Sequence, residues 1–273
     1  MQQLQASLLT FATDVLRLSV WLLLLIVVLV PLERLFPVRP SRVFRKSVGV
    51  DLGYYYLNNL VLKIILVAPM ALLAWGLHQV VPRGLQTWSE GLSLWMRVAA
   101  AFVVGELGFY WGHRWTHQSA VLWRFHAIHH SAEHVDWLVN TRAHPLDIVF
   151  VRLCGLVPMY ALGLAAPMRG QTVDVVPVII LLVAGLWGFF IHANVRFRFG
   201  WLGQLVSTPA FHHWHHTNDE HVNKNYASML PFIDRLFGTL YMPKEWPTKY
   251  GIDGQVAPGL PAQLLDPLLP HHK

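Results

Sequence analysis

The chain has 273 residues, of which 54% are hydrophobic and 13% are charged, and its formal net charge at pH 7 is +6. Soluble domains usually contain about 25% charged residues, so this composition argues against an ordinary soluble protein and favours one that is partly solvated by lipid. The single cysteine, Cys154, excludes an internal disulfide and a four-cysteine iron–sulfur site. The basic excess fits membrane topology, because no arginine-rich tract with interleaved aromatic residues predicts nucleic-acid binding.

Five apolar stretches predict five membrane-embedded helices. No basic region or cleavage site typical of a signal peptide accompanies the first stretch, so we expect it to stay as a helix. Each stretch is near the roughly 20 residues that a bilayer crossing needs. The stretches run roughly over residues 16–32, 54–81, 92–111, 148–166 and 175–191. Arg152 and Pro158 interrupt the fourth, so the last two are predicted either as two crossings or as a re-entrant hairpin.

The distribution of lysine and arginine predicts the orientation in the membrane. Basic residues gather after the first, third and fifth stretches, whereas the opposite loops contain only Arg83 and Arg169, with Arg97 at a span end. Because cytoplasmic loops carry the excess of positive charge, we expect the N-terminus outside and those three segments in the cytoplasm. They would form a helical, histidine-rich cap, which gives an all-α integral membrane protein with its histidine clusters on the cytoplasmic side.

The sixteen histidines are concentrated on that predicted cytoplasmic face. Side chains three and four residues apart share one side of a helix, so each cluster would point its rings in one direction. The clusters form one H-x-x-x-H pair, two H-x-x-H-H triads and a single histidine at the end of the fifth stretch. They are His113 and His117; His126, His129 and His130; His212, His215 and His216; and His192.

Nine converging imidazoles predict two metal ions, because one ion rarely takes more than about six protein ligands. Imidazole suits iron, zinc, copper and nickel, so the ligand type does not name the metal. Arg114 stands beside His113 where a zinc protease needs glutamate, which excludes that motif. We expect His213 to point away from its triad. Isolated histidines, such as His78, His221, His271 and His272, are expected to bind no metal.

Two further residues are candidates for the site. Glu106 shares a helical stripe with His113 and His117, so we expect it to accept a hydrogen bond from a metal-bound histidine, the alternative being a polar partner elsewhere in the bundle. His144 precedes Pro145 and is either a ligand or the partner of a nearby carboxylate. Three carboxylates could replace Glu106 in its role: Asp136, Asp219 and Asp234.

Two strings of residues resemble the fatty acid hydroxylase / sterol desaturase superfamily of membrane-bound di-iron oxygenases. The first contains His113–His117, residues 123–131 and His144-Pro145. The second contains Thr208–His216, Asn225-Tyr226 and residues 234–239. The resemblance covers roughly residues 105–241. It predicts N-terminal transmembrane helices over 1–104, a catalytic domain with two further membrane helices over 105–241, and an irregular tail over 242–273.

The resemblance implies an oxidoreductase with two iron ions that uses O₂ to hydroxylate or desaturate a C–H bond of a membrane lipid; zinc could replace iron in purified protein. The lipid could be a fatty acyl, sterol, sphingoid or ether lipid. The implied ligands are the nine clustered histidines. Some members have a further histidine where this chain has Arg196, so one ligand is either missing or replaced by water, Asn194 or His144. No cytochrome b5-like domain is fused, so electrons are expected from a separate cytochrome b5, ferredoxin or similar reductase.

Two other functions stay open at this point. A membrane di-zinc hydrolase would use a metal-activated water. A metal transporter or binding protein would place ionisable residues along a path through several spans, whereas these histidines gather at one face.

Overall fold

The structure is a computed structural model that describes residues 1–165 and 175–269. Over these residues every regular element is a helix, and the only strand-like pairings are isolated bridges between Pro37 and Val195 and between Thr217 and Tyr250. The prediction of an all-α fold is therefore confirmed for this part of the chain. The longer elements are α1 (Gln2–Leu35), α2 (Val48–Ile65), α3 (Val67–Val80), α5 (Leu94–Gln118), α6 (Ala120–His130), α7 (Pro145–Ala161) and α8 (Val175–His192). The shorter ones are α4 (Arg83–Thr87), η1 (Trp88–Gly91), η2 (Trp137–Thr141), η3 (Gly200–Gln204), α9 (Pro209–His215), α10 (Pro231–Leu236), α11 (Leu260–Leu265) and η4 (Asp266–Leu268).

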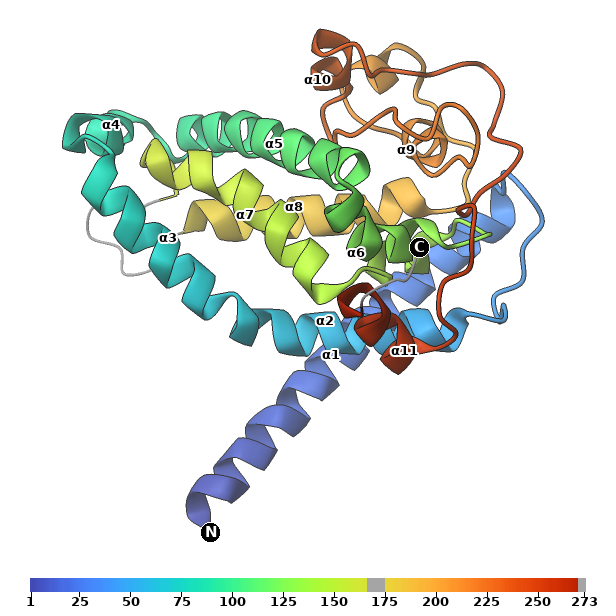
Figure 1. Cartoon of the computed structure of the whole chain (residues 1–273), viewed down its shortest axis with the longest axis horizontal. Coiled ribbons are helices and arrows are strands. Elements are labelled where there is room, and N and C mark those ends of the chain that lie inside the picture. The colour runs from blue at the N-terminus through green and yellow to red at the C-terminus, as the bar shows by residue number, and fades with distance from the viewer. Residues whose placement is uncertain (166–174, 270–273) are drawn as a thin grey trace.

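Three long helices form the centre of the molecule. Helix α5 packs on both α7 and α8, and α2 and α3 lie against α7 (Figure 1). Helices α6, α9 and α10 gather at one end of this bundle, together with the loops that follow α8. The N-terminal half of α1 extends away from the rest of the chain (Figure 1) and exposes apolar side chains such as Leu8 and Leu9.

Two helices, α1 and α8, are long and apolar enough to cross a membrane. Helices α2 and α3 meet at a bend of 40° and would make a third span if they count as one. Helices α5 and α7 form where the third and fourth spans were expected, but neither passes this length and hydropathy test in the described part of the chain. Polar residues such as Arg97, Glu106 and His113 lower the hydropathy of α5. The number of five spans stays a prediction.

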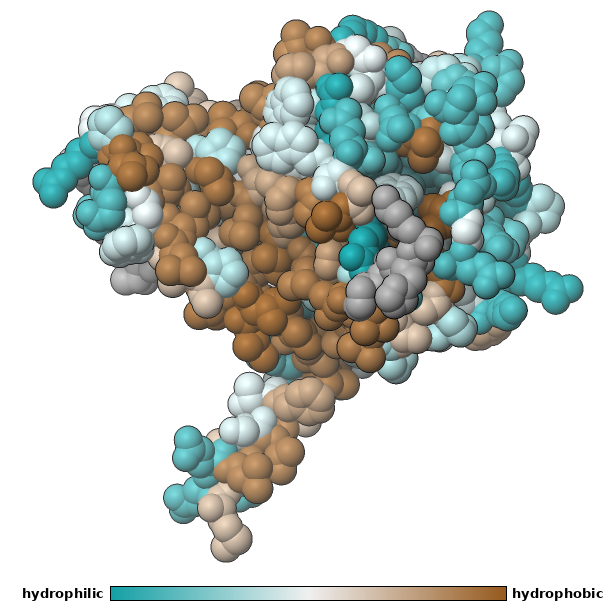
Figure 2. Space-filling model, in the orientation of Figure 1, coloured by the Kyte–Doolittle hydropathy of each residue, from teal (hydrophilic) through white to brown (hydrophobic). Residues whose placement is uncertain are grey.

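The surface separates into apolar and polar regions. Hydrophobic residues cover α3, α5 and α7, whereas hydrophilic residues gather over α9 and the C-terminal segments (Figure 2). An apolar surface of this extent is expected where lipid covers a protein.

Glycines bring α5 and α7 into backbone contact. A Cβ atom at Gly108 would lie 2.1 Å from the carbonyl oxygen of Cys154, and one at Gly112 would lie 2.7 Å from Cys154 Cβ. Small residues allow this approach between membrane helices. The contact sets the first turn of α7 beside the C-terminal end of α5, where the first histidine pair lies.

Buried ion pairs fix the segment between α6 and α7. Asp51 of α2 lies 2.5 Å from the guanidinium groups of both Arg45 and Arg142, and Arg45 also bonds Asp136. Asn58 of α2 donates to the carbonyl groups of residues 141 and 143. These bonds hold the chain that leads from the histidines of α6 into α7.

Glu33 ties α1 to the same end of the bundle. Its Oε1 atom accepts hydrogen bonds from the backbone N–H groups of Trp137 and Asn194, over 2.9 and 2.8 Å. Leu29, one helical turn earlier, packs with Trp137 in a buried apolar cluster. The C-terminal end of α1 therefore supports the loop that follows α8.

Candidate metal centre

A break between α5 and α6 turns the first two histidine clusters toward each other. Ser119 has extended backbone angles, ends α5 and caps α6 by accepting a hydrogen bond from Leu122 N–H. Serine at this position commonly starts a helix in this way. The ring of His113 consequently lies 4.9 Å from that of His126, and the ring of His117 lies 4.7 Å from that of His130, measured between centroids.

The third cluster is carried by α9, whose start is fixed by two residues. The Thr208 hydroxyl accepts a hydrogen bond from Phe211 N–H, and Pro209 occupies the first helical position, where its missing N–H costs nothing. Helix α9 packs against α8, whose last residue is His192. The rings of His192 and His212 are 4.1 Å apart.

The structure brings all nine clustered histidines into two adjoining groups. Within each group the candidate ligand atoms lie within 4.8 Å of one another. One group contains His113, His117, His126, His130 and His215, and the other contains His129, His192, His212 and His216. The neighbours His129 and His130 belong to different groups, and so do His215 and His216, so the two groups lie next to each other.

Backbone carbonyl groups determine which ring nitrogen of several histidines carries the proton. A carbonyl oxygen can only accept, so the Nδ1 atom that bonds it must be protonated. The Nδ1–H groups donate to Tyr226 O from His113 (2.7 Å), Arg142 O from His129 (3.0 Å), Gly188 O from His192 (2.7 Å) and Lys224 O from His215 (3.0 Å). Each of these four neutral rings therefore has an unprotonated Nε2 atom with a lone pair.

Several of these lone pairs face each other. His129 Nε2 and His192 Nε2 are 3.2 Å apart, and His192 Nε2 lies 2.9 Å from His212 Nε2. Neither His129 Nε2 nor His192 Nε2 carries a proton, so no hydrogen bond joins these two atoms and their lone pairs repel. His215 Nε2 is buried without any hydrogen-bond partner, and both ring nitrogens of His117 and of His130 are likewise unpaired.

A metal ion in each group would remove this conflict. Two imidazole nitrogens at about 2.1 Å from one ion and about 90–110° apart are separated by about 3.0–3.4 Å. The Nε2–Nε2 distances of 2.9–3.2 Å in the group around His192 agree with that value. The residues present therefore fit bound metal ions.

Burial keeps these imidazoles neutral. It lowers the pKa of His129 to about 4 and the pKa of His215 to about 3. The pKa of His130 is also held well below its usual value, first by burial and then by the neighbouring rings of His216 and His215. Neutral imidazole is the form that binds metal, so the rings need not lose protons at neutral pH.

Asp147, which the sequence analysis did not select, is the carboxylate that contacts a clustered histidine. His126 Nδ1–H donates to Asp147 Oδ2 over 3.0 Å, and both side chains are buried. A carboxylate in this position orients a metal-bound histidine and makes it more basic. The available signal was its place in the first turn of the helix that begins after His144 at Pro145.

Glu106, expected to bond a histidine, bonds backbone instead. Its carboxylate accepts hydrogen bonds from the Ser228 hydroxyl and from the N–H groups of Met229 and Leu230. It thereby fixes the loop between α9 and α10 onto α5, and the alternative of a polar partner elsewhere in the bundle holds. Glu106 still lines the cavity described below.

His144 and Asn194, the candidates for a tenth ligand, lie outside both histidine groups. His144 caps α7: Nδ1 accepts from Leu146 N–H, and Nε2–H donates to Leu264 O. The Asn194 side chain donates to Arg39 O and accepts from Arg39 N–H. Both side chains have their polar atoms engaged elsewhere.

The other carboxylates considered do not contact the clustered histidines. Asp136 pairs with Arg45, and Asp219 pairs with His221. Asp234 accepts from Tyr226 N–H and Ala227 N–H, which positions the carbonyl group that holds His113.

His213 points away from its triad, as expected. Its Nδ1 atom lies 2.7 Å from the Tyr250 hydroxyl, and its Nε2–H donates to Ala193 O. His271 and His272 lie outside the described residues.

A cavity of about 320 Å³ leads from between α5, α7 and α8 to the histidines. Most of its wall is apolar, and one end is formed by five of the clustered histidines. These are His113, His126, His129, His192 and His212. An apolar cavity that ends at polar, convergent groups is typical of a site for a small molecule or part of a lipid.

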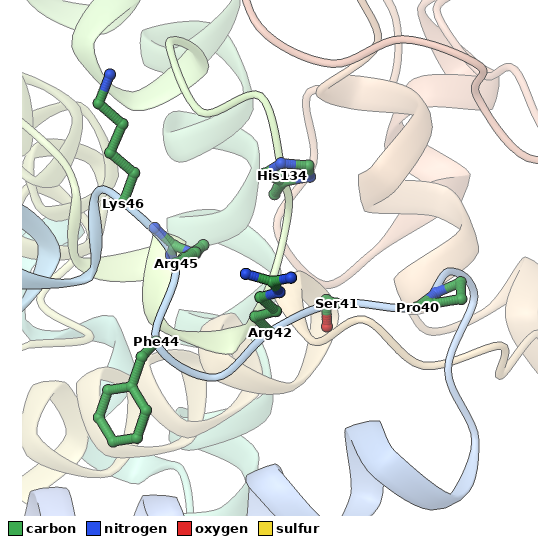
Figure 3. A pocket seen from close by; sticks show the side chains of 7 residues that line it. All are labelled: Pro40, Ser41, Arg42, Phe44, Arg45, Lys46 and His134. Carbon is green, nitrogen blue, oxygen red and sulfur yellow. The ribbon is translucent and has the colours of Figure 1, made fainter.

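A second, basic hollow of about 480 Å³ lies between the loop after α1 and His134 (Figure 3). It is lined by Pro40, Ser41, Arg42, Phe44, Arg45, Lys46 and His134. None of the nine clustered histidines lines it, and Arg45 is engaged by Asp51 and Asp136. It is therefore a positively charged surface feature and not the reaction site.

Comparison with known proteins identifies relatives of this chain. A family model described as fatty acid hydroxylase matches residues 98–239. Ornithine lipid hydroxylase OlsE of Rhizobium tropici is 37% identical over 185 residues, which cover 66% of this chain and 53% of that protein. Alkylglycerol monooxygenase of Danio rerio is 30% identical over 166 residues, 60% of this chain and 34% of that protein. Very-long-chain aldehyde decarbonylase GL1-11 of Oryza sativa subsp. indica is 28% identical over 204 residues, 67% of this chain and 69% of that protein.

The chain thus spans about half the length of the first of these relatives and about a third of the second. No solved structure matches it.

Proposed function

The chain belongs to the fatty acid hydroxylase family, and from that premise we propose that it uses O₂ to oxidise a C–H bond of a membrane lipid at a centre of two iron ions. The observation that carries the proposal is the arrangement of nine imidazoles, eight of them buried and that of His117 half-buried, around opposed, unprotonated nitrogens at the end of an apolar cavity. The hydroxylase and monooxygenase relatives support the same class of reaction.

The two histidine groups would each hold one ion. The group around His126 offers five imidazoles and the group around His192 offers four. Iron bound there would supply the activation of O₂, which no side chain of the protein can perform. Imidazole also binds zinc, so zinc could occupy the site in purified protein.

The protein's own groups prepare the site for this chemistry. Four backbone carbonyl groups accept hydrogen bonds from the Nδ1–H groups of four histidines and so fix those rings with Nε2 facing inward. These carbonyl groups belong to Tyr226, Arg142, Gly188 and Lys224. Asp147 does the same for His126 with a charged acceptor. Groups held by such partners need little reorganisation when a ligand binds.

The cavity between α5, α7 and α8 would hold the reacting part of the lipid. Its apolar wall excludes water from the histidine end and favours a hydrocarbon segment over a polar solute. Its volume is at the lower end of the range for small-molecule sites, so we expect only part of a lipid to enter. Hydroxylation and desaturation both begin at a C–H bond, and the site supports either.

We infer that α1, the bent pair α2–α3, α5, α7 and α8 are all embedded in the membrane, with the histidine end in the cytoplasm. The apolar surface over α3, α5 and α7 and the basic segments after the first, third and fifth stretches support this arrangement (Figure 2). The electron donor would then be a separate cytoplasmic protein or domain.

The test is oxidation of lipid by purified protein in lipid nanodiscs, with metal content measured in the same sample. Incubation with a bacterial lipid extract, a reductant and ¹⁸O₂ should give a lipid that gains one ¹⁸O atom or loses two hydrogen atoms by mass spectrometry. Oxygen incorporated from water by zinc-loaded protein under nitrogen would support the hydrolase instead. Metal flux into sealed vesicles would support the transporter.

A further inference from the structure

A charged residue, Arg152, lies in the wall of the apolar cavity. It shares a stripe of α7 with Ile148, Gly155 and Met159, which are spaced at helical intervals and all line the cavity. Gly155 and Met159 of that stripe contact Gly105 of α5. Arg152 therefore directs its side chain to the space that leads to the histidines.

Among the residues that the structure describes, the guanidinium group of Arg152 has no acceptor and takes part in no hydrogen bond, ion pair or ring contact. Neither carboxylate in the same wall forms an ion pair with it: Glu106 accepts three hydrogen bonds from residues 228–230, and Asp147 holds His126 through Oδ2 while its Oδ1 has no hydrogen-bond partner. Arg152 is half-buried and differs from the buried arginines, because Arg97 bonds Gly163 O and Arg142 bonds Asp51.

An arginine does not lose its proton in a protein, and an unpaired cation in apolar surroundings is strongly unfavourable. Such a residue in a membrane helix usually marks a binding site for a group of opposite charge. The planar guanidinium matches a carboxylate or phosphate through two parallel hydrogen bonds. We propose that Arg152 binds the anionic group of the lipid substrate, a carboxylate or phosphate, inside the cavity.

This placement limits which bond is oxidised. Asp147, which contacts His126, and Arg152 are five residues apart on α7, a rise of about 7.5 Å along the helix. Arg152 thus lies about one and a half turns of α7 beyond Asp147 in the wall of the same cavity, so the anionic group and the oxidised carbon would share one cavity of about 320 Å³. The inference rests on the proposed function and adds that the substrate is an anionic lipid oxidised close to its headgroup, not at the far end of an acyl chain.

The test measures binding, not turnover. Metal-loaded, full-length protein in nanodiscs of neutral phosphatidylcholine is titrated with radiolabelled palmitate and with hexadecanol, which has the same chain without the charge. Empty nanodiscs give the background partition of each probe. Wild-type protein should bind palmitate at least tenfold more tightly than hexadecanol. R152Q should lose most of that preference while hexadecanol binding and metal content stay unchanged.

Two controls identify the source of the preference. R83Q removes an exposed arginine of α4 and should bind both probes as wild type does. Acetate at the palmitate concentration should not displace palmitate, whereas displacement would show a site for free anions rather than lipid anions. R152K keeps the charge without the planar fork and should retain part of the preference.

The proposal is overturned if wild-type protein does not distinguish the two probes, or if folded R152Q retains the full preference. The wild-type comparison holds even if R152Q does not fold. Failure of the proposed function would look different. The protein, with two metal ions bound, would bind palmitate through Arg152 but would oxidise no lipid. That result would contradict the oxygenase function and leave the role of Arg152 in anion binding intact.

Discussion

Asp147 gives the sharpest test of how the protein holds its metal. In D147N the amide oxygen can still accept from His126 Nδ1–H, so the geometry is kept while the charge is lost. Hydrogen bonds to charged groups contribute about 1.5–3 kcal/mol and neutral ones about 0.5–1.5 kcal/mol. The substitution should therefore weaken the His126 contact by about 1–1.5 kcal/mol, which corresponds to about five- to tenfold weaker metal binding.

D147A removes the acceptor altogether and should cost about 10–100-fold in metal affinity, the range seen for partners of ligating histidines. Affinity is measured by competition between metal-loaded protein and a chelator, with bound metal counted by mass spectrometry. D253N, which changes a fully exposed aspartate, is the matched control. Asp147 also lies in the first turn of α7, so thermal unfolding of the metal-free variants separates a loss of helix stability from a loss of affinity. Metal affinity equal to wild type in both D147N and D147A would refute the role of this contact.

Three further outcomes are expected. H129A should abolish turnover and lower the bound metal, whereas H144A should keep the metal and cost about 0.5–2 kcal/mol of stability as a lost helix cap; equal metal loss in both would contradict the assignment. Metal-free protein should lose stability as the pH falls below 6.5, the ordinary pKa of histidine. Below this pH the histidines of the unfolded chain bind protons, whereas His129 and His215, with pKa values of about 4 and about 3, stay neutral in the folded state. A thermal-unfolding temperature that does not change from about pH 7.5 to 5 would count against this. G108A should destabilise the α5–α7 contact by about 1–3 kcal/mol, whereas G76A, whose added methyl group meets nothing within 4 Å, should be neutral; chemical unfolding of the two variants compares them.

The sequence predicted which histidines lie close together, because helical spacing alone fixes which rings share a face. The i, i+3 and i+4 pattern of His126, His129 and His130 needs only an α-helix to bring the rings to one side, and α6 supplies it. The same rule placed His213 outside the triad. How the triad would be divided was not predictable, since His129 and His130 contribute to different groups only because α9 and the end of α8 approach from another direction.

The contacts that the sequence did not predict all depend on tertiary packing. Asp147 reaches His126 because glycines let α5 and α7 touch, a distance that no local pattern encodes. Glu106 lies on the expected stripe of α5, but the loop at 228–230 supplies nearer donors than any histidine. His144 caps α7, a role for which any side chain that accepts a hydrogen bond is sufficient. A ligand role was considered only because the residue is a histidine.

The membrane spans show the limit of hydropathy as a guide. Helix α5 carries the first histidine pair and several buried polar residues along one face, so its mean hydropathy does not reach that of α1 or α8. A helix that lines a reactive site needs polar residues, and these residues weaken the signal that identifies a span.

The central claim is that nine histidines from four separate helices surround two metal ions. The most direct measurement is X-ray absorption at the iron edge of purified, iron-loaded protein, together with the iron count per chain. The account predicts about two iron ions per chain, a first shell of imidazole nitrogens at about 2.1 Å and the loss of this signal in H129A. Iron absent after loading, or a first shell without imidazole nitrogens, would contradict it.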